Sequence, residues 1–113
     1  MPKTQIPVAT SVKSSALEAS RVLKSTPGML KSIIITNTKA SDQYIQLHDA
    51  AAVPADAVVP EVPFLIPAGA TVCLDYSDNG GRYFYNGIVV CNSSTVATKT
   101  IGSADCFFCA EVL

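Results

Sequence analysis

The chain has 113 residues, 49% of them hydrophobic and 15% charged, with a formal net charge of −1. This length holds one compact domain, because either half alone would bury too little apolar surface, and the apolar content excludes an intrinsically disordered protein. No segment reaches the ~20 apolar residues of a membrane-spanning helix, and the N-terminus lacks the apolar core of a secretory signal. We therefore expect no membrane partner and folding in a reducing cytosol.

Basic and acidic side chains are unevenly distributed. Residues 1–40 carry six basic side chains and one acid, whereas residues 41–113 carry two basic side chains and eight acids. This predicts that residues 1–15, which include Lys3 and Lys13, form a basic arm that docks on an acidic surface of a neighbouring subunit. The alternative is that the lysines only solvate a surface. They are too scattered for a nucleic-acid patch, so no nucleic-acid partner is expected.

Strand signals follow one another along the rest of the chain. Short runs of β-branched or alternating residues are separated by turn residues such as Thr26-Pro27-Gly28. A helix over residues 14–24 is disfavoured, because its apolar residues form no continuous stripe. Strands are therefore predicted at residues 20–25, 29–38, 43–48, 62–66, 71–76, 82–92 and 104–112.

Two of these strands have a predicted position in a sheet. The run Ile33-Ile34-Ile35 indicates that the strand at residues 29–38 is buried on both faces. Pro63 cannot donate a ladder hydrogen bond, so the strand at residues 62–66 should lie at an edge.

Turn and loop signals divide the strands. Residues 77–81 read Ser-Asp-Asn-Gly-Gly, which predicts a hairpin turn, and Asn86-Gly87 predicts a bend within the strand at residues 82–92. Residues 49–61, rich in alanine and interrupted by two prolines, predict a long loop of the kind that often has a function.

The predicted fold is all-β. Seven to eight short strands without crossover helices exclude a parallel α/β sheet, so we expect one antiparallel β-sandwich or jelly-roll-like domain at residues 16–113, preceded by the extended arm at residues 1–15. The low charged fraction also predicts that part of the surface is buried against another copy or a partner.

Four cysteines are candidate metal ligands. Cys106 and Cys109 have the C-x-x-C spacing of a half zinc site, which Cys73 and Cys91 could complete. On a strand, however, residues i and i+3 face opposite ways, so we favour free thiols packed as small hydrophobic groups. A disulfide stays open as an alternative. We expect no metal and no other cofactor.

Catalytic signals are weak. His48 is the only histidine, and its sequence neighbour Asp49 would point away from it on a strand. No nucleophile-elbow motif occurs. Asp78-Asn79-Gly80 is more typical of a turn than of a calcium loop. We therefore expect no enzymatic activity.

Tyrosines are the candidate contact residues. Alternation around Phe84 predicts that Tyr83 and Tyr85 share one face while Phe84 points to the other, and Tyr44 lies on the polar face of its strand. Exposed tyrosines favour a subunit interface, although stacking on sugars or bases is the alternative. The predicted interface residues are Lys3, Lys13, Tyr44, Tyr83 and Tyr85.

A series of turn and strand motifs spans roughly residues 16–113. The motifs before the alanine- and proline-rich loop are Arg21-Val22-Leu23-Lys24, Thr26-Pro27-Gly28, Ile33 to Thr38 and Tyr44 to His48. The motifs after it are Phe64-Leu65-Ile66-Pro67-Ala68-Gly69, Phe84-Tyr85-Asn86-Gly87-Ile88 and Cys91-Asn92-Ser93-Ser94-Thr95. This pattern resembles small structural proteins of tailed-bacteriophage virions.

The resemblance implies a β-sandwich component of a virion, made in the host cytoplasm. Its expected role is that of a decoration or cement protein that binds the major capsid protein or other virion proteins as a homo-oligomer, most often a trimer. It implies no catalytic residues. The alternatives are a receptor- or carbohydrate-binding module of a tail fibre, or a head–tail adaptor.

Overall fold

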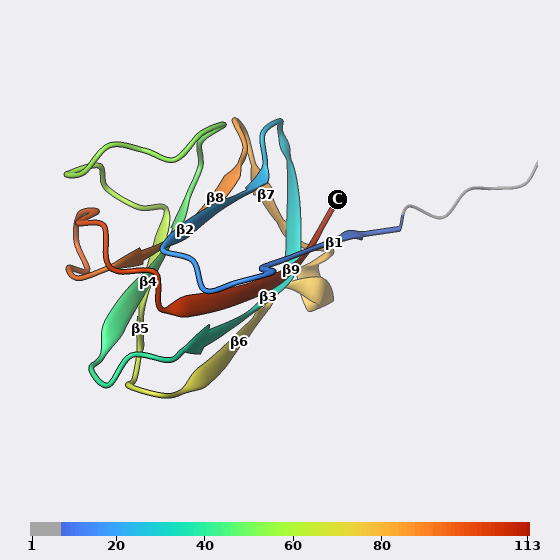
Figure 1. Cartoon of the computed structure of the whole chain (residues 1–113). Helices are drawn as coiled ribbons and strands as arrows, with labels where there is room; N and C mark the ends of the chain where they lie inside the picture. The colour runs from blue at the N-terminus through green and yellow to red at the C-terminus, as the bar shows by residue number, and fades with distance from the viewer. Residues whose placement is uncertain (1–7) are drawn as a thin grey trace, which may run out of the picture.

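The computed structural model describes residues 8–113, which form nine strands in two sheets packed face to face (Figure 1). The all-β sandwich expected from the sequence is confirmed. No helix in residues 8–113 is long and apolar enough to cross a membrane. The strands are β1 (Thr10–Lys13), β2 (Ser20–Lys24), β3 (Gly28–Asn37), β4 (Gln43–His48), β5 (Val62–Ile66), β6 (Thr71–Asp75), β7 (Arg82–Phe84), β8 (Ile88–Ser93) and β9 (Cys106–Val112).

The strand order is that of a jelly roll. Sheet A has the order β1-β9-β3-β6, with β7 also paired to β3, and sheet B has the order β2-β8-β4-β5. The antiparallel pairs β1–β9, β2–β8, β3–β6 and β4–β5 are nested inside one another along the chain. One long folded ribbon therefore wraps into two sheets, as in a jelly roll.

The core lies between the sheets and follows the alternation of the strands. Ile33 and Ile35 of β3 face Ile45 and Leu47 of β4 in one cluster of fully buried side chains, which also contains Phe84. Burying each large aliphatic side chain contributes about 1.5–3 kcal/mol to folding. β5 lies at an edge of sheet B, which confirms the position predicted from Pro63.

Strand β3 is buried on only one face, so the prediction of two buried faces was wrong. Ile34, between the buried Ile33 and Ile35, is 44% exposed. The reason is architectural. In a two-layer sandwich, one face of each sheet packs on the core, whereas a continuous apolar run is typical of sheets covered on both sides.

The glycine-rich segment 77–81 does not form a hairpin turn. Strand β6 pairs with the second half of β3 and β7 with its first half, so both run in the same direction along one edge of β3. The segment between them is a short 3-10 turn, η1 (Ser77–Asn79), and Gly80 and Gly81 supply the positive φ angles. The turn prediction is confirmed, but the hairpin is not.

The predicted strand at residues 82–92 is divided between the two sheets. β7 belongs to sheet A and β8 to sheet B, and the chain crosses over at residues 85–87. Asp49 holds this crossover, because its carboxylate accepts hydrogen bonds from the backbone N–H groups of Tyr85 at 3.0 Å and Asn86 at 2.7 Å. The predicted bend is therefore a passage between sheets.

The N-terminal arm predicted for residues 1–15 is partly incorporated into the sandwich. Residues 10–13 are edge strand β1, paired with β9 of the same chain. The backbone N–H of Phe108 then donates to Ser14 Oγ at 3.0 Å. Pairing within the sheet satisfies backbone groups that an extended arm would leave to solvent. Residues 1–7, including Lys3, lie outside the described residues.

Candidate functional site

The two sheets differ in what covers their outer faces. On the outer face of sheet B, the central strands β8 and β4 lie beneath two loops, residues 49–61 and 94–105, seen at the left of Figure 1. On the outer face of sheet A, by contrast, Ile34 is 44% and Phe107 42% exposed. We call the outer face of sheet A the open face.

Backbone hydrogen bonds join the two covering loops. Ala57 N–H donates to the carbonyl of Lys99 at 2.7 Å, and Lys99 N–H donates to the carbonyl of Val58 at 2.8 Å. Beneath them, Gln46 and His48 are buried although they point away from the core. The predicted division of β4 into two faces is confirmed, but the polar face is covered rather than solvated.

Gln46 fixes the loop at residues 94–105 and orients His48. Its Nε2 lies 2.9, 3.1 and 3.0 Å from the carbonyl oxygens of Thr95, Val96 and Thr98. These acceptors place the amide nitrogen toward the loop, so Oε1 faces His48 Nε2 at 3.1 Å. Because that oxygen can only accept, His48 carries its proton on Nε2.

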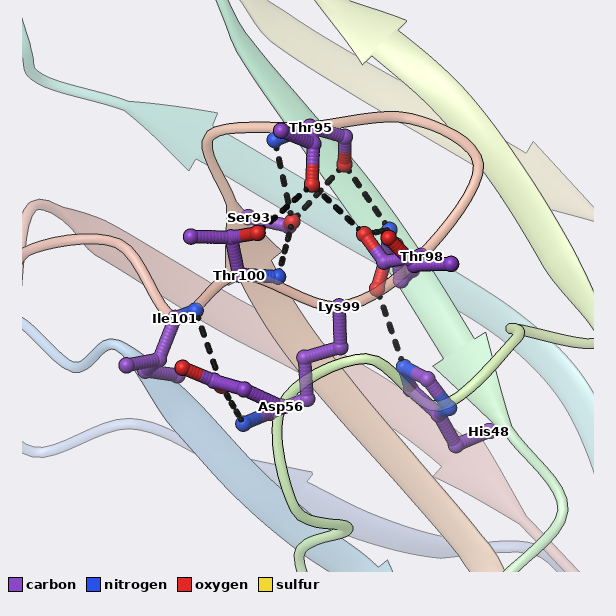
Figure 2. A network of polar contacts seen from close by, with 9 residues as sticks. His48, Asp56, Ser93, Thr95, Thr98, Lys99, Thr100 and Ile101 are labelled. Atoms are coloured by element: carbon purple, nitrogen blue, oxygen red, sulfur yellow. Dashed lines mark hydrogen bonds and ion pairs between the residues drawn. The ribbon is translucent and has the colours of Figure 1, made fainter.

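An ion pair links the two covering loops. The side chain of Lys99 is 5% exposed, and its Nζ lies 2.8 Å from Asp56 Oδ1. The same carboxylate also accepts the N–H of Ile101 at 3.2 Å (Figure 2). The hydrogen bond from Lys99 lowers the pKa of Asp56. Burial, together with the nearby charge of Lys99, lowers the pKa of His48.

The covered region does not supply an activated nucleophile. Burial raises the pKa of the Cys91 thiol to about 11, so at neutral pH it remains protonated. The lowered pKa keeps His48 neutral as well. A thiolate–imidazolium pair would require the opposite shifts. These polar groups tie the loops to sheet B.

The open face is organised by the register of sheet A. Ile34 pairs with Cys73 of β6 on one side and Cys109 of β9 on the other, and Cys109 pairs in turn with Lys13 of β1. Directly paired residues point to the same face. This places Lys13, Cys109, Ile34 and Cys73 in one row across four strands. The neighbouring rows are Phe107, Thr36, Thr71 and Ser11, Glu111, Ser32, Asp75.

The four cysteines do not converge. Cys106 points into the core and Cys109 to the open face, as expected for positions i and i+3 of a strand. Cys73 shares the open face with Cys109, but β3 lies between them, and two strand spacings of about 4.8 Å exceed the reach of a disulfide. Cys91 belongs to sheet B.

The four cysteines are free thiols, and their positions do not meet the convergence that the disfavoured zinc alternative required. Within residues 8–113, no three His, Cys, Asp or Glu side chains gather as they would around a metal ion. The same residues enclose no pocket.

The predicted interface residues separate into two groups. Tyr83 and Tyr85 stack edge to face, with ring centroids 4.8 Å apart, and are 47% and 74% exposed. Tyr83 pairs with Met29 at one end of sheet A, and Lys13 lies on the open face of that sheet. Tyr44 lies in sheet B, half-buried and paired with Ser93, so it does not join them.

Sequence analysis missed the centre of the open face. Ile34 was assigned to the core because it stands in an unbroken run of isoleucines, and Cys73 and Cys109 were weighed as metal ligands, disulfide partners or packed thiols but not as surface residues. Alternation within β9, where Phe107 and Cys109 are opposite in phase to Phe108, is the signal that identifies this face. No protein-family model, curated protein or solved structure matches this chain.

Proposed function

We propose that this chain is an assembly protein that acts by binding other protein subunits through the open face of sheet A. The observation that carries the proposal is the contrast between the two sheets. Loops cover the central strands β8 and β4 of sheet B, whereas Ile34 on β3 and Phe107 on β9 remain exposed on the central strands of sheet A.

The chemistry of the open face is that of a protein contact. A solvated sheet face normally carries polar side chains, whereas the row through Ile34 contains two thiols and one lysine. Depletion of charge at the centre with polar groups at the rim is typical of interfaces between proteins. Lys13 and Asp75, on the outer strands, form such a rim.

We propose further that the assembly is a bacteriophage virion. The resemblance of the sequence to small virion proteins supports this, and jelly rolls recur in viral capsid domains. Support from the fold is analogy, because one fold serves many functions. The chain would then decorate the particle as a symmetric homo-oligomer, for which the resemblance implies a trimer, bound to the major capsid protein or another virion protein.

Co-sedimentation with phage heads that lack the protein tests this role. Ile34→Asp places a charge at the centre of the open face, and Leu65→Asp places the same charge on an exposed position of sheet B. We expect wild type and the Leu65 variant to bind the heads, and the Ile34 variant to remain in solution. Equal binding of both variants would remove the open face from the mechanism, and no binding by wild type would remove the virion role.

One observation favours a second candidate, a carbohydrate- or receptor-binding module. The exposed edge-to-face pair Tyr83–Tyr85 offers aromatic surface on which a sugar ring can stack. Binding on a glycan array that is lost in Tyr85→Ala would favour this function. An array without signal would leave assembly as the proposal.

A further inference from the structure

We infer that a single water molecule binds between the side-chain amides of Gln43 and Asn92, at one end of the core between the two sheets. This binding site links β4, β8 and the segment that leads into β9. It lies on the core side of sheet B and is independent of the proposed function.

Both side chains point into the core. Gln43 alternates with the buried Ile45 and Leu47 along β4, so the three share one face. Asn92 of β8 pairs directly with Ile45 and therefore faces the same way. Gln43 is 5% exposed and Asn92 is fully buried. Two amides from neighbouring strands are thus enclosed at one end of the core.

The orientation of each amide is fixed by its nitrogen. Gln43 Nε2 donates to the carbonyl of Asp42 at 2.7 Å, and Asn92 Nδ2 donates to the carbonyl of Ser103 at 2.9 Å. Turning either amide over would place its oxygen against a carbonyl oxygen, which cannot donate. Gln43 Oε1 and Asn92 Oδ1 are therefore the acceptors, and both are buried without a donor from residues 8–113.

A third amide at the same end of the core has all the partners that it needs. Asn37 is the last residue of β3, and its Nδ2 donates to the carbonyls of Ser41 at 3.1 Å and Pro67 at 3.2 Å. Its Oδ1 accepts the N–H of Lys39 at 3.0 Å. Burying an amide oxygen without a donor is costly, so the two remaining oxygens require a donor that the described residues do not supply.

Gly102 brings the two amides together. A Cβ on Gly102 would lie 3.0 Å from Gln43 Oε1 and 2.9 Å from Asn92 Nδ2, so both side chains lie against this residue. The N–H of Gly102 donates to the backbone carbonyl of Asn92 at 2.8 Å, which holds the glycine in place. Residues 8–113 enclose no pocket, so the occupant is no larger than one water molecule.

Water fits the chemistry of this site better than a cation does. It has two O–H donors, one for each unpartnered oxygen, and no net charge. A metal ion would need more oxygen ligands and a balancing carboxylate. The two acids nearest in sequence are already engaged, because Asp42 Oδ1 accepts the N–H of Ala68 at 3.0 Å and Asp105 accepts the hydroxyl of Ser103. Lys39, whose Nζ donates to Ser103 Oγ at 3.2 Å, adds a positive charge that opposes a cation.

A high-resolution crystal structure of the full chain tests the site directly. We expect one water molecule about 3 Å from both Gln43 Oε1 and Asn92 Oδ1. A direct hydrogen bond between the two amides would overturn the inference, and so would two separate water molecules. An ion about 2.4 Å from both oxygens would also overturn it, because that distance is typical of a metal ligand.

A double-mutant cycle tests in solution whether one water molecule serves both amides. Gln43→Met and Asn92→Leu each remove one oxygen, and either change breaks the bridge and leaves the other oxygen without a donor. We therefore expect the double variant to be less destabilised, in urea titrations, than the sum of the single variants. Gln43→Met combined with Ser11→Ala, on the outer face of sheet A, is the control and should be additive.

Additive effects of the two amide substitutions would contradict a shared water molecule. Where a variant does not fold, the crystal structure of the wild type still decides, because it needs no substitution. Neither result depends on the virion role. Heads that bind the wild type leave this inference untouched, and an absent water molecule leaves the open face of sheet A available to other subunits.

Discussion

Lys99 and Asp56, 43 residues apart in the sequence, form an ion pair with 2.8 Å between Nζ and Oδ1. The pair joins the loop between β4 and β5 to the loop between β8 and β9, and both loops cover sheet B. The contact therefore holds the cover over the central strands of sheet B, on the side of the sandwich opposite the open face.

Truncating one partner of this ion pair should reduce the stability of the fold more than truncating the other. Asp56→Ala leaves the ammonium group of Lys99 buried and unpaired, whereas Lys99→Met removes that charge and leaves Asp56, which is 55% exposed, to solvent. We expect Asp56→Ala to lower the free energy of unfolding more than Lys99→Met does, in urea titrations. The double variant should resemble Lys99→Met, and a double variant less stable than both would contradict this account.

Stability should decline as the pH falls below about 6.5, the ordinary pKa of histidine. Burial lowers the pKa of His48, so the unfolded chain binds a proton more readily than the folded protein. The contribution of the neutral His48 to the free energy of unfolding is complete above pH 6.5 and is lost as the pH falls toward the pKa of His48 in the folded protein. His48→Gln should flatten the pH dependence of the urea midpoint between pH 7.5 and 5.

In the His48→Gln variant, a second loss of stability should remain at lower pH. Hydrogen bonds from backbone N–H groups and from Lys99 lower the pKa values of Asp49 and Asp56 below their ordinary 3.8, so their contribution exists above that pH and disappears below it. If His48→Gln keeps the slope of wild type between pH 7.5 and 5, His48 is not the group responsible.

Substitutions of two adjacent isoleucines of β3, Ile33 and Ile34, should differ sharply in their effect on the free energy of unfolding. Ile33→Thr loses buried apolar surface and inserts a hydroxyl into the core, at a cost of about 2 kcal/mol or more. Ile34→Thr keeps the β-branch at an exposed position and should change the stability of the monomer by less than about 0.5 kcal/mol. Thermal or urea unfolding at low protein concentration measures both, and similar losses would show that the open face is packed.

Gly87 should tolerate no side chain. A Cβ there would clash with the backbone carbonyl of Ala50 and lie 2.7 Å from that of Lys24, neither of which can move freely. We expect Gly87→Ala to cost about 3 kcal/mol or more, or to prevent folding. Gly69→Ala is the control, because Gly69 has φ +69° but open space around it, and it should cost only about 1–2 kcal/mol.

Thiol labelling of the dilute protein should divide the cysteines into two pairs. Cys73 is exposed and Cys109 half-exposed, whereas burial raises the pKa of Cys91 and Cys106 to about 11. Maleimide should therefore modify the first pair in the native state and the second only on unfolding. Mass spectrometry of tryptic peptides assigns each site, and early labelling of Cys91 would indicate that the covering loops open.

Most strand positions followed from local patterns, although β1 fell within the predicted arm and the predicted strand at residues 82–92 is two strands, β7 and β8. The alternation in Gln43–His48 predicted both the bounds of β4 and the division of its side chains between two faces. The number of buried faces was predicted wrongly where the local sequence fits two arrangements. Three consecutive isoleucines suit a strand covered on both faces equally well, and only the layer arrangement shows that Ile34 is exposed.

The candidate site was less accessible to sequence reasoning. Alternation predicted that Tyr83 and Tyr85 lie opposite Phe84, and only the burial of Phe84 shows that the tyrosines are on the exposed side. The row Lys13, Cys109, Ile34 and Cys73 comes from four strands distant in the chain. A row across a sheet depends on register, and register is set by long-range pairing and packing rather than by neighbours in sequence.

Alternation, turn residues and the lack of helical stripes specify an antiparallel β-sandwich, because side-chain period and backbone freedom are local properties. The nesting of the strands into a jelly roll, the Lys99–Asp56 closure over sheet B and the open face of sheet A arise only when distant segments meet. Burial and hydrogen bonding of such segments are properties of the folded whole, so they became visible with the tertiary structure.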